Sequence, residues 1–90
     1  MKSFGVECIM KYTFLLRRNI FMYNHVLTVT DGSAHWEAII ESHPGREHAM
    51  LIWPQDFGFP ESETEAIKAE MTQWFAQQNE ACLFYAGKGR

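Results

Sequence analysis

The chain of 90 residues has little that would stabilise it through covalent or metal bonds. Its two cysteines, Cys8 and Cys82, are far apart in sequence, and neither a CxxC pair nor a histidine at metal-ligand spacing accompanies them. A disulfide-rich secreted miniprotein is therefore excluded, and we expect two free thiols in a cytoplasmic protein. The longest apolar run near the start, residues 12–16, is too short for a signal sequence or a membrane span.

Motifs that carry catalysis are also missing. The sequence contains no HExxH, no nucleophile elbow and no glycine-rich loop of the kind that cradles a phosphate. We therefore expect no enzymatic activity and no bound cofactor.

Basic charge is scarce over most of the chain, whose net charge is −3. Residues 1–21 hold four basic residues and one acidic residue, a net charge of +3, whereas residues 22–90 hold four basic and ten acidic residues, a net charge of −6. Because nucleic-acid binding depends on lysines and arginines that neutralise phosphates, we expect no direct binding to nucleic acid. An acidic body suits a protein or ribonucleoprotein partner with a basic surface.

The hydrophobic content of 47% and the aromatic content of 14% are sufficient for one domain with a thin core. We expect residues 1–90 to form this single domain. The charge changes sign near Met22, so residues 1–21 are either an N-terminal extension of a shorter product or the first strand of a hairpin.

Alternating apolar and polar residues predict several strands. Period two over residues 4–16 predicts a first strand, with a helix as the alternative. A polar break at residues 17–19 separates it from a second strand over residues 20–30. Asp31-Gly32 is typical of a two-residue hairpin loop, which leads directly into a third strand over residues 34–42.

Loop lengths set the expected pairing of these strands. The two-residue loop places Leu27 opposite Trp36, and a four-residue loop over residues 43–46 pairs Ser42 with Glu47. Because side chains alternate, this pairing divides them between two faces of the sheet. Face one collects the large apolar residues Tyr12, Phe14, Leu16, Phe21, Tyr23, Leu27, Val29, Trp36, Ala38, Ile40, Ala49, Leu51 and Trp53, together with His25.

A single helix follows these strands. Ser62 and Glu65 have the spacing of a capping box, and the helix is expected to end near Asn79, before a short last strand over residues 81–86. Four apolar residues form a stripe that can lie on face one: Ile67, Met71, Trp74 and Phe75. The predicted fold class is α+β, a mostly antiparallel sheet of four to five strands in the order β-β-β-β-α-β, with one helix packed on one face.

Face two of the sheet has no predicted cover. It is expected to carry the partner-binding residues Val26, His35, Glu37, Ile39, Glu41, His48, Met50 and Ile52, with Ile9, Leu15, Ile20 and Met22 beside them. An apolar stripe rimmed by charge is typical of a protein-binding or self-association surface. The alternative is the ordinary preference of valine and isoleucine for strands, even where they are exposed.

The charged residues of face two and of the helix have weaker alternatives. His48 is expected opposite Glu41, within reach of acid-base or metal chemistry, but Glu37 and Glu41 are about 13 Å apart along a strand and cannot share one ion. A solvated charged face is the favoured interpretation. The acidic helix residues Glu61, Glu63, Glu65 and Glu70 are either solvated or engage a basic surface on a partner.

Three further positions have a structural and a functional interpretation. His25, on the apolar face, is expected to be a hydrogen-bonded core histidine rather than a ligand. Trp36 and Trp53 are expected to pack in the core. The aromatic tip over residues 57–59 either binds a partner or tucks under the start of the helix.

These observations favour a small, non-enzymatic protein-binding module or inhibitor that occupies a surface of a larger macromolecular partner. In size, acidity and lack of catalytic motifs the chain is similar in type, though not in motif, to the compact inhibitors of phages and mobile elements, including anti-CRISPR proteins. The alternative is a homodimeric regulatory domain that binds a small ligand where its two copies meet.

Overall fold

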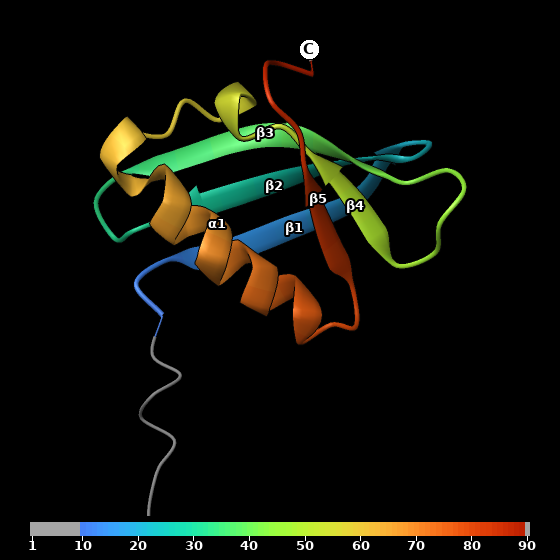
Figure 1. The fold of residues 1–90 in the computed structure, drawn as a ribbon, viewed down its shortest axis with the longest axis horizontal. Helices are drawn as coiled ribbons and strands as arrows, with labels where there is room; N and C mark the ends of the chain where they lie inside the picture. Colours follow the sequence, from blue (N-terminus) through green and yellow to red (C-terminus); the bar gives the residue numbers. More distant parts are fainter. Residues whose placement is uncertain (1–9, 90) are drawn as a thin grey trace, which may run out of the picture.

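The computed structural model of the chain describes residues 10–89. Its elements are β1 (Thr13–Phe21), β2 (Asn24–Thr30), β3 (His35–Ser42), β4 (Ala49–Ile52), the short 3-10 helix η2 (Pro54–Asp56), α1 (Glu61–Ala76) and β5 (Ala81–Phe84). The strands form one sheet in the order β1-β2-β3-β4-β5 (Figure 1). Neighbours are antiparallel except β4 and β5, which are parallel. The α+β prediction is confirmed.

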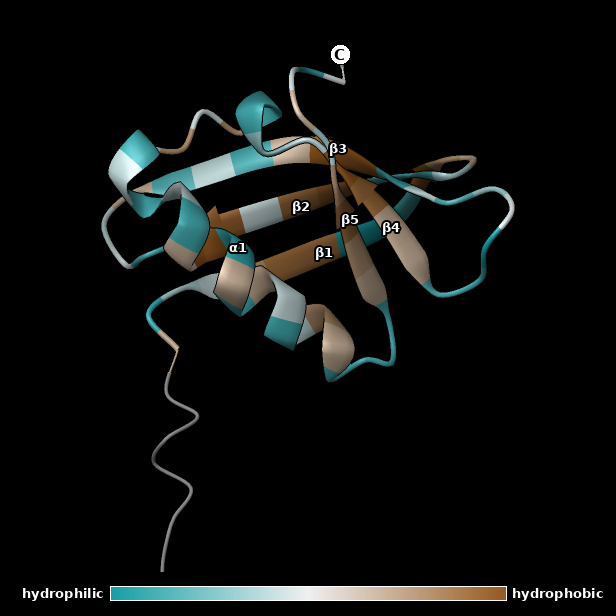
Figure 2. Cartoon of the chain, viewed as in Figure 1, coloured by the Kyte–Doolittle hydropathy of each residue, from teal (hydrophilic) through white to brown (hydrophobic). Residues whose placement is uncertain are grey.

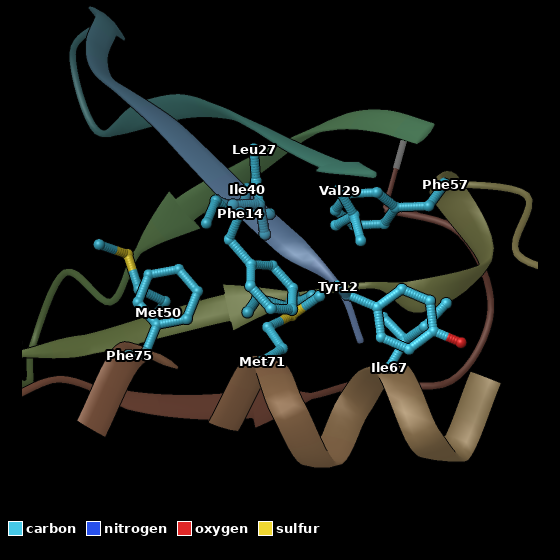
Figure 3. Packing of buried hydrophobic residues seen from close by; sticks show 11 residues of the cluster. Tyr12, Phe14, Leu27, Val29, Ile40, Met50, Phe57, Ile67, Met71 and Phe75 are labelled. Atoms are coloured by element: carbon cyan, nitrogen blue, oxygen red, sulfur yellow. The ribbon is translucent and has the colours of Figure 1, made fainter. Parts of the chain in front are cut away.

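The helix α1 connects β4 to β5 and lies across face one of the sheet (Figure 1). The predicted stripe is confirmed, because Ile67, Met71 and Phe75 have no exposed surface and Trp74 packs beside them. Burial of each such side chain contributes about 1.5–3 kcal/mol to the free energy of unfolding. Figure 3 shows Ile67, Met71 and Phe75 of α1 against the sheet residues Phe14, Leu27, Val29, Ile40 and Met50 and the loop residues Tyr12 and Phe57. Ile52 belongs to the same cluster.

The start of α1 differs from the predicted capping box. The helix begins at Glu61, its N-cap is Pro60, and no side chain caps it. Pro60 has an extended backbone and no N–H group, so the N-cap lies two residues before Ser62. The Thr64 hydroxyl instead donates to the Pro60 carbonyl at 3.0 Å. The helix ends at Ala76, earlier than predicted.

The turn between β2 and β3 spans residues 31–34, so the prediction of a two-residue loop is wrong. The Asp31 carboxylate accepts hydrogen bonds from two backbone N–H groups of the turn, at 2.8 and 2.9 Å, and these bonds lower its pKa. This side-chain cap favours the longer turn. Leu27 consequently lies opposite Ala38 rather than Trp36. A slip of two residues leaves every side chain of β3 on its predicted face.

The pairing of β3 with β4 also differs, and here the difference reverses a strand. The loop covers residues 43–48, and Ser42 pairs with Met50 instead of with Glu47. This slip of three residues inverts both faces of β4. Met50 and Ile52, predicted on face two, are 2% and 0% exposed in the core on face one.

The first hairpin extends further than predicted. β1 continues through the expected break at residues 17–19, and the turn to β2 lies at Met22-Tyr23. Phe21 and Tyr23, predicted to be core residues, are largely exposed. The structure describes a hairpin strand over Thr13–Phe21. The expectations for residues 1–9 lie outside the described residues.

Candidate binding surface

Face two is the side of the sheet opposite α1, and within residues 10–89 no helix packs against it. Val26 lies beside Ile39 on the neighbouring strand, and Leu51 lies beside Leu83. Leu15 of β1 belongs to the same face and is 62% exposed. The apolar stripe predicted for face two therefore exists, although Leu51 and Leu83 take the places that were assigned to Met50 and Ile52.

Charged residues lie among these apolar side chains. Glu37 accepts a hydrogen bond from the Thr28 hydroxyl at 2.9 Å and lies 3.7 Å from the Arg17 guanidinium. His35 occupies the exposed start of β3, and Glu41 lies opposite Leu51. The structure thus places on face two five of the predicted binding residues: Val26, His35, Glu37, Ile39 and Glu41.

The predicted pairing of His48 with Glu41 does not occur. His48 is exposed in the loop between β3 and β4, where its backbone φ is 61° and its Nε2 atom is 3.9 Å from Glu47. The longer loop moves His48 out of the strand, and Leu51 lies opposite Glu41. Among the residues that the structure describes, no cluster of three or more His, Cys, Asp or Glu side chains could hold a metal ion.

Two of the four acidic helix residues bind the start of β1. The Tyr12 hydroxyl donates to Glu63 at 2.7 Å, and Glu70 accepts the backbone N–H groups of Lys11 and Tyr12 at 3.1 and 2.9 Å. Tyr12 is 3% exposed, and burial together with the Glu63 carboxylate raises its pKa to about 12. Glu63 and Glu70 therefore have a structural role, because their carboxylates hold Lys11 and Tyr12 against α1.

The other two acidic helix residues are exposed beside a groove. Glu61 and Glu65 line this open groove of about 690 Å³, together with Phe59 and Lys88. The Glu65 carboxylate is also 3.4 Å from the ammonium group of Lys68. Of the predicted acidic set, only this pair remains available for contact with a partner.

His25 is a buried, hydrogen-bonded histidine, as predicted. Its Nδ1 atom accepts the backbone N–H of Asn19 at 2.8 Å, and its Nε2 atom lies 2.6 Å from the Ser42 hydroxyl. Nδ1 must therefore be unprotonated, and Nε2 carries the proton that it donates to Ser42. Burial and the nearby Arg18 lower the pKa of His25, which keeps the ring neutral.

This arrangement fixes an irregularity in β1. Three residues, 18–20, lie opposite the single residue His25, so β1 bulges before its end. Asn19 has a left-handed backbone with φ 55°, and Arg18 binds Glu80 through two hydrogen bonds of 3.0 and 2.7 Å. We call these contacts, from His25 to Asn19 and Ser42 and from Arg18 to Glu80, the His25 network.

At the end of the bulge lies a surface that the sequence did not predict as one unit, because Ile20 and Met22 were expected beside face two and Phe21 and Tyr23 in the core. Ile20, Phe21, Met22 and Tyr23 are 45%, 65%, 72% and 62% exposed, and we call these residues the apolar tip. In Figure 3 the tip lies far from α1, on the opposite side of the sheet, and Figure 2 shows hydrophobic colour reaching this end of the hairpin. One signal was available: four large apolar residues in succession cannot all point to one face of a strand.

The aromatic loop before α1 turns inward. Phe57 and Phe59 stack with their ring centroids 4.8 Å apart, and Trp36 and Phe59 meet edge to face with their centroids 5.4 Å apart. Of the two interpretations of this loop, packing beside the helix therefore applies. Trp53 was expected in the core, but it stacks on Tyr85 at 5.5 Å, outside the core cluster.

Cys82 is the one cysteine among the residues that the structure describes. Cys82 is a free thiol, and burial raises its pKa to about 12, which makes it a poor nucleophile.

No helix within residues 10–89 is long and apolar enough to cross a membrane. No protein family, curated protein or solved structure matches the chain.

Proposed function

We propose that this protein is a small, non-enzymatic binding protein that occupies a surface of a larger macromolecular partner. The observation that carries the proposal is the apolar stripe on face two, against which no helix packs within residues 10–89. In this stripe Leu15 is 62% exposed, Ile39, Leu51 and Leu83 are half-buried, and Val26 is 9% exposed. Because most of its surface is exposed to water, the Leu15 side chain contributes little to the free energy of unfolding. A contiguous exposed apolar patch with a charged rim is characteristic of protein interaction sites.

The charges near this stripe support recognition rather than catalysis. Arg17 of β1 and Glu37 of β3 approach to 3.7 Å across β2, which gives the apolar stripe a charged border where the pair crosses that strand. A partner surface must match both the stripe and this border, and such a match increases specificity more than affinity.

Affinity purification with matched variants tests the proposal. The bait proteins are the wild type, the face-two variant Leu15→Lys/Ile39→Thr, and the control Gln73→Lys, which changes an exposed position of α1. We expect one protein or complex to bind the wild type and the control, and its affinity for the face-two variant to be at least tenfold weaker. Equal binding of all three, with all three folded, would reject face two as the contact surface.

A narrower form of the proposal is an inhibitor of the type carried by phages and mobile elements, including anti-CRISPR proteins. The acidity and small size of the chain support it, and Glu61 and Glu65 would contact a basic surface of a protein or ribonucleoprotein. Charge reversal at these two residues should then weaken binding, and the purified partner should contain RNA if it is a ribonucleoprotein. Binding that survives the reversal would eliminate the acidic contact.

A homodimer is the second candidate, because β1 is a nine-residue strand at the edge of the sheet. An edge strand carries backbone groups that can pair with another chain. Light scattering at micromolar concentration separates the two candidates. A stable dimer favours the homodimeric regulatory domain, with a small ligand bound between its copies, and a monomer counts against it.

A further inference from the structure

The apolar tip, residues 20–23, is the most exposed apolar segment that the structure describes. All four side chains have between 45% and 72% of their surface in water. Single exposed apolar residues are common on proteins, but a run of four large ones at the end of a hairpin is a defined surface. These side chains contribute little to the core on face one, so their apolar character requires another explanation.

The backbone of the tip is held in an unfavourable conformation. Met22 has a φ of 53°, in the left-handed region where glycine or asparagine is usual for a hairpin turn. The most exposed apolar side chain of the tip thus stands where a side chain is least favoured. Strain retained at a surface position without a packing benefit points to a functional contact.

The tip is also ordered before any partner arrives. The His25 network fixes the bulge on one side of the tip, and the backbone N–H of Ser42 donates to the Tyr23 carbonyl at 2.9 Å on the other. A contact surface that is already rigid loses less conformational entropy when it binds. The tip therefore has the properties of a preformed anchor.

The shape and charges of the tip define what it fits. A lipid surface would call for free basic residues beside the tip, yet Arg17 lies 3.7 Å from Glu37 and Arg18 lies 2.7 Å from Glu80. A symmetric contact with the tip of a second copy would bring one convex turn against another, which buries little area. A convex apolar anchor is complementary to a concave apolar pocket on another protein.

We propose that residues 20–23 form a preformed plug that inserts into a concave apolar pocket on a protein partner. The inference rests on the proposed binding function and adds anchors at Phe21, Met22 and Tyr23 to the contact surface on face two. Aromatic residues and methionine are enriched in the buried centre of interfaces, where a few side chains carry most of the binding energy.

Site-specific photocrosslinking tests the plug directly. The photoreactive amino acid p-benzoylphenylalanine replaces Met22 in one variant, Leu15 of face two in a second, and Gln73 of α1 in a third, all produced in the native host. We expect Met22→p-benzoylphenylalanine to crosslink to a protein partner, with the crosslinked partner residues in an apolar pocket, and the Gln73 variant to give no such product.

The other outcomes are decisive in different ways. Crosslinking from position 15 but not from position 22 would overturn the plug and leave the proposed binding function standing. Crosslinking from neither would overturn both. A crosslink from position 22 to a second copy of the chain, or to lipid, would overturn the protein pocket as the occupant.

A second variant separates binding from stability at the same residue. Met22→Asn suits the left-handed backbone better than methionine and removes the apolar side chain. We expect its unfolding temperature to equal or exceed that of the wild type, while its affinity for the crosslinked partner falls at least tenfold. An unchanged affinity would overturn the plug.

Discussion

Replacement of His25 by leucine tests how the first hairpin is held. His25→Leu replaces the imidazole by an apolar side chain of comparable size at a position that is 2% exposed, and so removes both ring nitrogens. The backbone N–H of Asn19 loses its acceptor, and the Ser42 hydroxyl loses its donor. The perturbation is therefore confined to polar contacts, and a cavity makes only a minor contribution.

The size of the effect follows from these two contacts. Each hydrogen bond contributes about 0.5–1.5 kcal/mol net, and a buried polar group left without a partner costs about 1 kcal/mol or more. We expect the free energy of unfolding to fall by about 2–3 kcal/mol in His25→Leu and by about 1 kcal/mol in Ser42→Ala, which removes one contact only. For a domain of this size, 2–3 kcal/mol lowers the unfolding temperature by about 10–20 °C.

Urea denaturation at two pH values provides the assay. The pKa of His25 is lowered from 6.5 by burial and by Arg18, against the opposing effect of Glu80. The unfolded chain therefore takes up a proton first as the pH falls, so this contribution to stability is complete above pH 6.5 and is lost below it. We expect the wild type to lose more stability than His25→Leu between pH 7 and pH 5.

Two results would refute this reasoning. One is a free energy of unfolding for His25→Leu within about 0.5 kcal/mol of the wild type at pH 7, the range of neutral surface substitutions. The other is an identical pH dependence in the wild type and the variant, which would mean that His25 titrates alike in the folded and unfolded states.

Three further predictions concern the core. Tyr12→Phe removes the hydroxyl bonded to Glu63 and should lower the free energy of unfolding by about 1.5–3 kcal/mol in urea denaturation. If the losses in stability of Tyr12→Phe and Glu63→Gln simply add in the double variant, the hydrogen bond between the two residues contributes nothing, and the prediction is wrong. Phe75→Ala removes a ring with no exposed surface and should cost about 3–5 kcal/mol in the same assay, and a cost below about 1 kcal/mol would contradict its position. Cys82, with a pKa raised to about 12, should react slowly with iodoacetamide at pH 8 in a folded Cys8→Ser variant and rapidly in urea, whereas rapid labelling without urea would argue against its burial.

The sequence predicted the class of fold because its strongest signals are local. Period-two alternation identified the strands of the sheet, and the spacing of Ile67, Met71 and Phe75 identified the face of α1 that meets them. Both signals depend only on the chain's own repeat and on the need to bury apolar area.

The pairing of strands was less predictable, because it depends on loop geometry. Pro44-Gly45 suggested a short turn, but the chain continues to His48, which adopts a left-handed backbone without being glycine. That extra length inverted β4 and moved Met50 and Ile52 from the predicted surface into the core. The slip of two residues in the hairpin between β2 and β3 left every side chain of β3 on its predicted face.

Only part of the candidate binding surface was predicted correctly, because side-chain alternation gives the face of a residue but not whether that residue is buried. Val26 and Ile39 lie where alternation placed them, on face two. The apolar tip was predicted only in part, because Ile20 and Met22 were expected beside face two, whereas Phe21 and Tyr23 were assigned to the core on their hydrophobicity. Apolar character alone does not distinguish a buried core residue from an exposed residue at a binding surface.

The attachment of β1 has a consequence for the order in which the protein can fold during synthesis. Apart from Glu37, which pairs with Arg17, the carboxylates that bind this strand and the two residues before it belong to Glu63, Glu70 and Glu80, all in the last third of the chain. A ribosome therefore releases the first hairpin, with its apolar end, well before the groups that hold it in place. Until Glu80 has emerged the nascent chain exposes an unsecured strand, and this is the interval in which a chaperone or an unwanted aggregate would compete for it.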